Sequence, residues 1–332
     1  MTAIKKRKAD HINICMEMGV ESGFTGFESL NFAHRIPTIS KKDISTKVKF
    51  LKWEFDLPFL ISSMTGGCKE AIDINRNLAG AAQSMNVPIA LGSGRAALDD
   101  KSLAKSYSVA RKAAPNAVIF SNIGAHQLKE YSPSQISELV KMVDADGIFV
   151  HFNPLQEAIQ PEGETDFRNV FSDVKKLASS AKVPVIAKET GCGFSGEDAK
   201  KLEKAGVAAI EIAGWGGTNF SLVEAYRRKD EIGRTFSAWG IPTLQSLMEC
   251  VDAVKIPIIC SGGMRTGIDA AKAIAVGASL IGFAKPLLGP AVTSKAAVEQ
   301  KLQHIASELK ISMFLTNSKN LPELRKAKLY VI

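Results

Sequence analysis

The sequence predicts an α/β fold, a TIM-type (β/α)8 barrel with an N-terminal arm. Eight short apolar runs carry this prediction, because each is continuous rather than alternating, as in strands that are covered on both faces. The runs are 58–63, 87–91, 117–121, 147–150, 183–187, 207–212, 256–260 and 280–284. They recur at roughly 25 to 50 residues, which leaves room for a helix and two loops between successive strands. Eight such units favour closure into a barrel over a doubly wound open sheet, which is the alternative.

The segments between the runs are typical of helices. Apolar residues recur three and four positions apart within 73–85, 134–143, 167–181 and 269–276. Ser195 is placed to cap a further helix, with Glu197 and Asp198 as first-turn acids. In the longest interval, 213–255, the glycines of 214–217 and 233–242 suggest extended loops at a site or in an ordered lid.

Two parts are expected along the chain, an N-terminal arm over 1–57 and a single barrel domain over 58–332. The first 57 residues are polar, with little periodicity, and hold a basic cluster that includes Arg7 and Lys8, followed by His11. They are either a frayed, solvated terminus or an arm that folds over a site for an anion. No break in composition divides the remainder, so we expect one domain there.

Composition places the chain among globular proteins, with 45% hydrophobic and 23% charged residues. No run reaches the roughly 18 apolar residues of a membrane span, and no apolar stretch of signal-peptide length follows the basic N-terminus. A cytoplasmic location without a membrane partner is therefore expected. The 5 cysteines are scattered and form no Cys-x-x-Cys, which argues against a disulfide frame or a zinc cluster. The net charge of +8 leaves three interpretations open: a nucleic-acid surface, an anionic small substrate or solvation alone. The basic residues are dispersed without interleaved aromatics, and the expectation is a small-molecule substrate and no nucleic-acid partner.

The most informative stretch is 151–157, which follows the fourth apolar run. His151, Asn153, Gln156 and Glu157 put four polar side chains within it. Such groups make a poor core unless they face a ligand, and parallel barrels bind ligands at the carboxyl ends of their strands. The acidic turn 160–167 comes next and would fold over the site. The competing interpretation is a polar loop with one satisfied histidine.

Every other predicted strand also ends in small, hydroxylic, amide or charged residues, which lets backbone and polar groups approach a ligand. Ser261-Gly262-Gly263 and Ala284-Lys285 follow the last two strands, where many barrels hold a phosphate. A helix that begins near Pro290 would add its N-terminal dipole. Lys188 ends the fifth strand, and an unpaired lysine is rarely tolerated in a core, so it is expected to face the barrel mouth.

These motifs together resemble the type 2 isopentenyl-diphosphate isomerase family, which is flavin-dependent. The resemblance covers nearly the whole chain and is carried by Arg7-Lys8…His11, Met64-Thr65-Gly66-Gly67, Leu91-Gly92-Ser93, His151-x-Asn153-x-x-Gln156-Glu157 with Pro161-Glu162-Gly163, and Ser261-Gly262-Gly263. The His-x-Asn-x-x-Gln-Glu element is specific, whereas the Gly-Gly elements occur in other FMN barrels. Gly94, Trp215 and Asn219-Phe220 depart from the family pattern.

The resemblance implies a set of site residues and cofactors. FMN would be held by Ser62, Ser63, Met64, Thr65, Ser93, Asn122, Lys188, Thr218, Gly262, Gly263, Met264, Arg265, Ala284 and Lys285. The diphosphate substrate would be bound by Arg7, Lys8, His11, Ser93, Gly94, Arg95, Asn153 and Gln156, with His151 nearby. Glu157 would hold the Mg²⁺ that bridges to the diphosphate, and a reduced nicotinamide, NADPH, would prime the flavin. Homo-oligomers, tetramers or octamers, are expected.

The chemistry of such a reaction agrees with this set. Moving a double bond needs one proton added and another removed, through a tertiary cation. Gln156 is a poor acid by itself, whereas reduced FMN offers a proton at N5 and an anionic ring that stabilises a cation. We therefore expect the flavin to act as acid and base without net redox change, with Gln156 and His151 as catalytic residues that orient or relay protons.

Three other functions compete with this one. An FMN-dependent 2-hydroxyacid oxidase or dehydrogenase needs a histidine base late in the chain, and none lies between His151 and His304. A purine-nucleotide dehydrogenase needs a cysteine nucleophile in a loop, and Cys192 lies after the wrong strand for that role. A basic barrel that binds phosphate or RNA without catalysis would carry no flavin.

Overall fold

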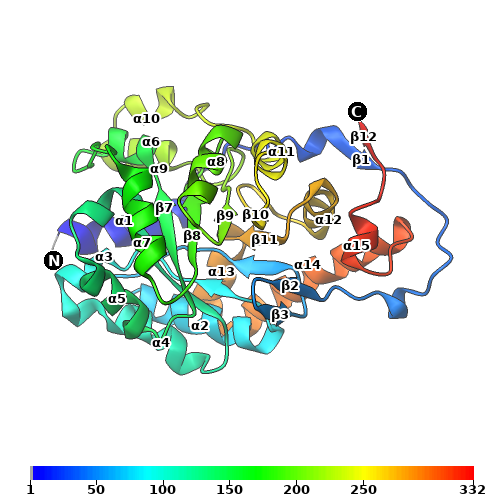
Figure 1. The fold of residues 1–332 in the computed structure, drawn as a ribbon, viewed down its shortest axis with the longest axis horizontal. Helices are drawn as coiled ribbons and strands as arrows, with labels where there is room; N and C mark the ends of the chain where they lie inside the picture. The colour runs from blue at the N-terminus through cyan, green and yellow to red at the C-terminus, as the bar shows by residue number, and fades with distance from the viewer. Residues whose placement is uncertain (1–2) are drawn as a thin grey trace.

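Eight parallel strands close into a barrel in the computed structural model, which describes residues 3–332 and the side chains from residue 7 onward (Figure 1). The barrel strands are β4 (Phe59–Ile61), β5 (Ile89–Ala90), β6 (Ile119–Gly124), β7 (Gly147–Phe152), β8 (Val185–Glu189), β9 (Ala209–Glu211), β10 (Ile258–Cys260) and β11 (Leu280–Phe283). They follow one another around the barrel in chain order, and β11 pairs with β4 to close it. The predicted barrel is confirmed.

Helices surround the barrel and connect its strands (Figure 1). They are α2 (Ala71–Met85), α3 (Arg95–Asp99), α4 (Lys105–Ala113), α5 (Pro133–Met142), α6 (Pro154–Ile159), α7 (Val170–Ser180), α8 (Gly196–Lys204), α9 (Phe220–Arg228), α10 (Ile232–Thr235), α11 (Thr243–Ala253), α12 (Gly267–Val276), α13 (Lys285–Thr293), α14 (Lys295–Leu315) and α15 (Leu321–Leu324). Short 3-10 turns add η1 (Phe27–Ser29), η2 (Lys41–Asp43), η3 (Lys101–Leu103) and η4 (Ala125–Lys129). The predicted cap at Ser195 is present, since its side chain accepts from the backbone N–H of Asp198.

Two sequence expectations about helices were wrong. The helix after the last strand begins at Lys285 rather than near Pro290, because Pro286 fits its first turn and Pro290 lies inside it. The interval 213–255 also holds more helix than the expected loops. There Asn219 caps α9 by accepting from the backbone N–H groups of Ser221 and Leu222, and α10 and α11 follow.

The barrel interior is organised in layers that change character along the strands. One inward layer is apolar and consists of Leu60, Ala90, Phe120, Phe149, Ile186, Ala209, Ile259 and Leu280. Since successive side chains of a strand alternate in direction, the next inward residue lies two positions on. Those residues are Ser62, Gly92, Asn122, His151, Lys188, Glu211, Ser261 and Gly282. The barrel interior is thus apolar towards the amino ends of the strands and polar towards their carboxyl ends.

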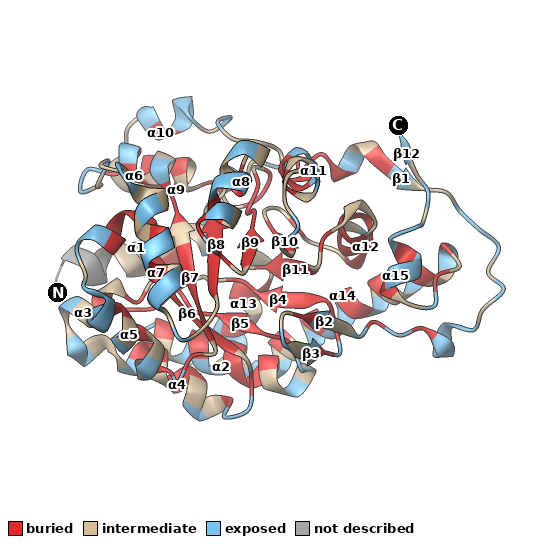
Figure 2. Cartoon of the chain, viewed as in Figure 1, coloured by how far each residue is buried: buried red, intermediate tan, exposed pale blue. Residues whose placement is uncertain are grey.

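The amino-terminal end of the barrel is closed by a hairpin of β2 (Val48–Phe50) and β3 (Trp53–Phe55), which form a separate two-stranded sheet. Phe50 and Phe55 are 1% and 3% exposed and belong to the same cluster as the apolar barrel layer. Trp53 meets Phe120 edge to face, with ring centroids 5.7 Å apart. Figure 2 shows the barrel strands mostly in red, as buried.

The rest of the first 57 residues forms helix and strand, although its sequence has little periodicity. It begins with α1 (Ala3–Glu17), which packs against α9 and α13 beside the carboxyl-terminal end of the barrel. Further on, β1 (Leu30–Phe32) pairs antiparallel with the C-terminal strand β12 (Leu329–Val331), so this part of the N-terminal region meets the C-terminal strand in one small sheet.

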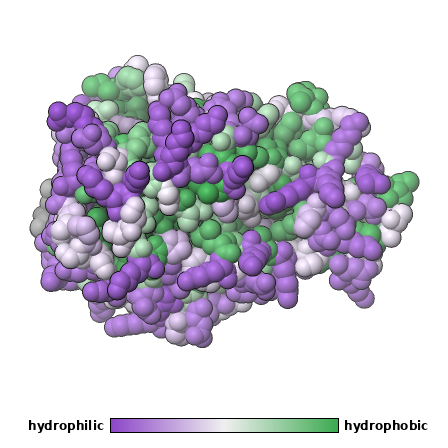
Figure 3. All heavy atoms as spheres, viewed as in Figure 1, coloured by the Kyte–Doolittle hydropathy of each residue, from purple (hydrophilic) through white to green (hydrophobic). Residues whose placement is uncertain are grey.

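The face in Figure 3 is covered mostly by hydrophilic side chains, with apolar atoms in small groups between them. Across residues 3–332, none of the helices combines the length and apolar character that crossing a membrane requires.

Candidate active site

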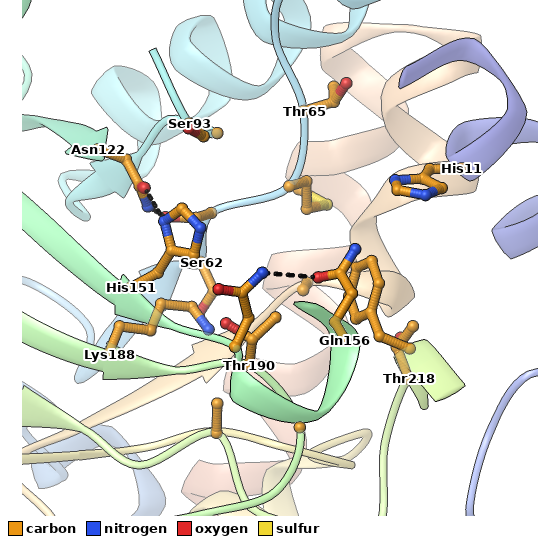
Figure 4. Close-up of a pocket in the computed structure, with 18 of the residues that line it drawn as sticks. His11, Ser62, Thr65, Ser93, Asn122, His151, Gln156, Lys188, Thr190 and Thr218 are labelled. Atoms are coloured by element: carbon orange, nitrogen blue, oxygen red, sulfur yellow. Dashed lines mark hydrogen bonds between the residues drawn. The ribbon is translucent and has the colours of Figure 1, made fainter. Parts of the chain in front are cut away.

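A cavity of about 240 Å³ opens at the carboxyl ends of the barrel strands. The whole polar inward layer borders it, and α1 covers it from the side with Arg7, Lys8 and His11 (Figure 4). The stretch 151–157 and the stretch 261–265 come together here, although more than a hundred residues separate them. Ligands of parallel barrels bind at this end.

Nearly all residues expected at the site border this one cavity. They are Arg7, Lys8, His11, Ser62, Ser63, Met64, Thr65, Ser93, Arg95, Asn122, His151, Asn153, Gln156, Glu157, Lys188, Thr218, Gly262, Gly263, Met264, Arg265, Ala284 and Lys285. Gly94 does not border it. Its N–H donates to the carbonyl of Asn122 at 2.8 Å, and a Cβ there would meet the side chain of Leu139 at 2.8 Å. Gly94 therefore turns the chain into α3 and offers no side chain to a diphosphate.

His151 is held by a hydrogen-bonded chain across three strand ends (Figure 4). The Asn122 amide nitrogen donates to Ser63 Oγ at 2.9 Å, which leaves the Asn122 oxygen facing His151 Nδ1 at 2.7 Å. This arrangement favours the tautomer with the proton on Nδ1 and a free acceptor at Nε2. Burial lowers the pKa of His151 to about 3, with His126, Lys8 and Lys188 adding repulsion. His151 is therefore a neutral imidazole at neutral pH. It can accept a proton or a hydrogen bond, but it does not carry an acidic proton as an imidazolium would.

Glu157 lies at the centre of a buried group of amides. One carboxylate oxygen accepts from the Asn153 amide at 2.8 Å, and the other accepts from the Gln160 amide at 2.6 Å and from the backbone N–H of Glu164 at 2.8 Å. The amide oxygens of Asn153 and Gln160 are buried and find no hydrogen-bond partner among the residues that the structure describes. Uncharged oxygens beside a carboxylate are the donors that Mg²⁺ takes. Within residues 3–332 no group of three His, Cys, Asp or Glu forms a metal site, so any cation here would rely on amides and a bound ligand.

Gln156 is oriented by a carboxylate that was not predicted. Its amide nitrogen lies 3.5 Å from Glu224 Oε1, and its oxygen accepts from the Asn153 amide at 3.2 Å. Glu224 is fully buried and also binds His11 Nε2 at 2.9 Å and Arg227 Nε at 2.7 Å. These contacts fix which end of the Gln156 amide faces each neighbour.

The same network ties the N-terminal helix to the acidic turn after β7. Arg227 binds Glu162 at 2.8 Å, and Arg7 lies 3.6 Å from the same carboxylate. The N-terminal helix α1 thus lies beside the cavity, which it borders with Arg7, Lys8 and His11. Burial lowers the pKa of Lys8 to about 8, with a further contribution from the nearby Arg7. Arg95, across the cavity, is paired with Glu164 at 3.0 Å.

A second group of cations marks an anion site at the last two strands. Arg265 and Lys285 both contact the carboxylate of Glu21, Lys285 at 3.0 Å. That carboxylate occupies the position of an anion between them. Gly262 and Gly263 have φ of +100° and +76°, a conformation that glycine adopts readily, and α13 begins at Lys285 beside the cavity. A phosphate group fits this set of donors.

The floor of the cavity holds a second unpredicted carboxylate, Glu211. It is fully buried, accepts from Ser62 Oγ and Ser261 Oγ at 2.7 Å each, and lies 4.0 Å from Lys188 Nζ. Its position inside the apolar run 207–212 was the available signal, since an acid in a buried strand requires a partner.

The departures from the family pattern fall beside the cavity. Phe220 borders it and meets His11 edge to face at 5.8 Å. Asn219 caps α9 and also donates to the carbonyl of Ser237 at 2.6 Å, while Trp215 donates to the same carbonyl at 2.8 Å. Trp215 and Asn219 therefore tie down the 214–242 loops, and Phe220 faces the ligand space.

Cys192 does not have the character of a nucleophile. Burial raises the pKa of its thiol, and Glu189 adds to the shift, so the reactive thiolate is disfavoured.

Comparison with known proteins connects this geometry to a family. The model of the FMN-dependent dehydrogenase family matches residues 155–331. An isopentenyl-diphosphate delta-isomerase of Archaeoglobus fulgidus is 43% identical over 98% of this chain and 95% of its own length. The chain belongs to the isopentenyl-diphosphate delta-isomerase family. Isomerases of this name from Halobacterium salinarum and Pyrococcus furiosus are 44% and 45% identical, over 100% and 96% of the chain.

Solved structures with lower identity share the fold of this isopentenyl-diphosphate delta-isomerase family member. A mandelate oxidase with a monooxide FMN adduct superposes with a TM-score of 0.69 at 19% identity, over 94% of this chain and 91% of the other. The flavin-binding domain of baker's yeast flavocytochrome b2 also gives 0.69 at 19% identity, over 94% and 78%. At such identity the likeness concerns the barrel alone.

Proposed function

We propose that this chain interconverts isopentenyl diphosphate and dimethylallyl diphosphate at reduced FMN, with Mg²⁺ on the diphosphate. The observation that carries the proposal is the convergence of Gln156 and Glu157 with the cations of α1 in one cavity. The identity of 43 to 45% to named isomerases over nearly the whole chain supports it.

Several features of the cavity fit FMN. The anion site of Arg265 and Lys285 would take its phosphate, and Lys188 lies on the floor where it would face a ring that gains negative charge. Thr190 Oγ1 and Glu211 Oε2 are buried polar atoms without protein partners among the described residues, as expected where a polar ligand belongs. When bound and reduced, FMN supplies a proton at N5 and an electron-rich face, and the reaction has no net redox change.

The protein residues in this proposal orient the substrate and move protons. Gln156 is fixed by Asn153 and Glu224, so it presents a directed amide to the allylic part of the substrate. His151 offers a neutral acceptor at Nε2, set by Asn122. Enclosure by α1 excludes water, which would otherwise capture a tertiary cation.

The diphosphate would be held at the rim of the cavity. Lys8 is a partly buried cation, and Arg7 and His11 stand on the same helix. Arg95 would exchange Glu164 for phosphate oxygens. Mg²⁺ would sit at Glu157, where the free oxygens of Asn153 and Gln160 complete the donor set. NADPH as reductant, assembly into tetramers or octamers and a cytoplasmic location remain predictions.

The hydroxyacid oxidase alternative is disfavoured by the histidines. His11, His126 and His151 border the cavity, whereas His304 lies on α14 and pairs with Glu308 at 3.0 Å. A late histidine base, which that chemistry needs, is therefore not at this site among the described residues.

The experiment is an anaerobic incubation of purified protein with FMN, Mg²⁺, NADPH and isopentenyl diphosphate, followed by product analysis. Dimethylallyl diphosphate should form, and omission of either FMN or the reductant should abolish it. Formation at the same rate without flavin would contradict the proposal. A protein that never takes up FMN would instead favour a phosphate-binding barrel.

A further inference from the structure

Glu211 is a buried carboxylate at the cavity to which the proposed reaction gives no role. It ends β9, has no exposed surface, and borders the cavity at its floor. A buried carboxylate costs several kcal/mol unless it is paired and hydrogen-bonded. Burial of Glu211 therefore lowers the free energy of unfolding unless contacts to the carboxylate offset this cost.

One oxygen of Glu211 is well satisfied by the protein. The hydroxyl groups of Ser62 and Ser261 both donate to Oε1, at 2.7 Å each. Gly282 makes room for this group, since a Cβ there would stand 2.3 Å from Ser62 Oγ and 3.1 Å from Glu211 Oε1. Four strand ends thus cooperate to fix the carboxylate in one orientation.

The second oxygen, Oε2, is buried and has no hydrogen-bond partner within the described part of the chain. An acceptor in this state requires an N–H or O–H donor, because an unmet buried hydrogen bond costs about 1–3 kcal/mol. An alkenyl diphosphate can offer none, since its chain is hydrocarbon and its ionised phosphates only accept. FMN offers both kinds of donor, in its ring N–H and its ribityl hydroxyls. The orphaned oxygen therefore suits the cofactor rather than the substrate.

Lys188 gives the carboxylate an electrostatic role as well. The two residues are in register on β8 and β9, and Lys188 Nζ lies 4.0 Å from Glu211 Oε1 while donating to the carbonyl of Glu189 at 2.5 Å. At this separation in a buried site the two charges offset each other strongly. A flavin above them would therefore experience much less positive field than Lys188 alone would produce.

We propose that Glu211 is a cofactor-positioning residue, which accepts a hydrogen bond from FMN through Oε2 and tunes the reduction potential of FMN by offsetting Lys188. This role rests on FMN binding as part of the proposed function. It predicts separate consequences for the contact and for the charge, so variants can distinguish them.

The test compares FMN-loaded wild-type protein with Glu211→Gln. Glutamine keeps the shape and the acceptor for both serines, but it replaces the second oxygen with an N–H donor. The FMN dissociation constant, measured by absorbance titration, should rise about tenfold or more. The midpoint potential, measured by anaerobic spectroelectrochemistry, should rise, because losing a negative charge favours the reduced flavin. A tenfold change in the two-electron equilibrium corresponds to about 30 mV.

Two matched variants separate the effects. Glu211→Asp keeps the charge but withdraws the oxygen, so it should weaken FMN binding while the potential stays near the wild-type value. Lys188→Met should shift the potential downward, opposite to Glu211→Gln, and the double variant should return towards wild type. These variants also decide the matter if Glu211→Gln fails to fold.

Unchanged affinity and potential in Glu211→Gln would overturn the inference, as would unchanged affinity in Glu211→Asp. Such results in a protein that binds FMN and isomerises the substrate would leave the proposed function intact. Wild-type protein that binds no FMN would instead contradict the proposed function itself.

Discussion

The two ends of the barrel use the same eight strands for different purposes. Towards the amino ends, the inward layer is apolar and is sealed by Phe50 and Phe55 of the β2–β3 hairpin. Two residues further along each strand, the inward layer includes Asn122, His151 and Lys188 and faces an open cavity. Since both layers sit on one rigid frame, the closed end holds the positions of the polar groups at the open end.

The difference between the two ends predicts that substitutions at the closed end affect mainly stability, whereas substitutions at the open end affect mainly turnover or binding. Substitutions in the apolar layer should reduce the free energy of unfolding and leave the chemistry intact in the folded fraction. Substitutions in the polar layer and its surroundings should reduce turnover or binding in a protein that remains folded.

The largest effect is expected from Phe120→Ala at the closed end. Phe120 is 1% exposed and contacts both Trp53 and Phe149 edge to face. Its truncation should lower the free energy of unfolding by about 3–5 kcal/mol. Urea denaturation measures this loss, and Phe236→Ala is the control because that ring is 39% exposed. Equal losses in the two variants would contradict a sealed apolar end.

The next effect is expected from Gln156→Asn at the open end. The shorter side chain withdraws the amide from both Glu224 and the ligand, so turnover should fall about 100-fold or more, as for loss of a group that moves or directs a proton. FMN affinity and the urea midpoint should stay at wild-type values. Gln245→Asn, at an exposed position on α11, is the matched control. Full turnover of Gln156→Asn with reduced FMN would remove Gln156 from the mechanism.

A smaller effect should appear in the pH dependence of substrate capture. Burial lowers the pKa of Lys8 to about 8, so Lys8 loses its charge as the pH rises through that value. Since the proposed function requires the charged form to bind the diphosphate, kcat/KM should fall above pH 8, by up to about tenfold per pH unit. Lys8→Arg should flatten this limb, because arginine stays protonated. Persistence of the limb in Lys8→Arg would assign it to another group.

The smallest effect is expected on the acid side. With a pKa of about 3, His151 is neutral at about pH 5 and above. His151→Asn should lower kcat but leave the shape of the pH profile unchanged between about pH 5 and 8. Disappearance of an acid limb in this variant would show that His151 titrates there.

The strands and most of the site could be predicted because both depend on short-range patterns. Each apolar run identifies its own strand, and residues such as His151 and Lys188 follow directly after one. Glu211 and Glu224 could not be assigned in this way. Their partners, Ser62 and His11, lie 149 and 213 residues away, so only the closed barrel reveals the contacts.

The N-terminal helix was missed for a related reason. The basic, weakly patterned sequence of α1 has little helical amphipathicity of its own, and its packing against α9 and α13 supplies the partner. Gly94 was expected to border the site, but a glycine next to Arg95 indicates only a loop and not which side of the loop faces the cavity. In the structure Gly94 packs closely against the side chain of Leu139 and does not border the cavity.

Hydrogen–deuterium exchange with and without FMN and an unreactive diphosphate analogue tests the division between the two ends most directly. Exchange should slow in the segments around residues 7–12, 151–157, 188–191 and 261–265, which border the cavity, and stay unchanged in the hairpin 48–55. Protection of the hairpin with no change at the cavity segments would contradict the account.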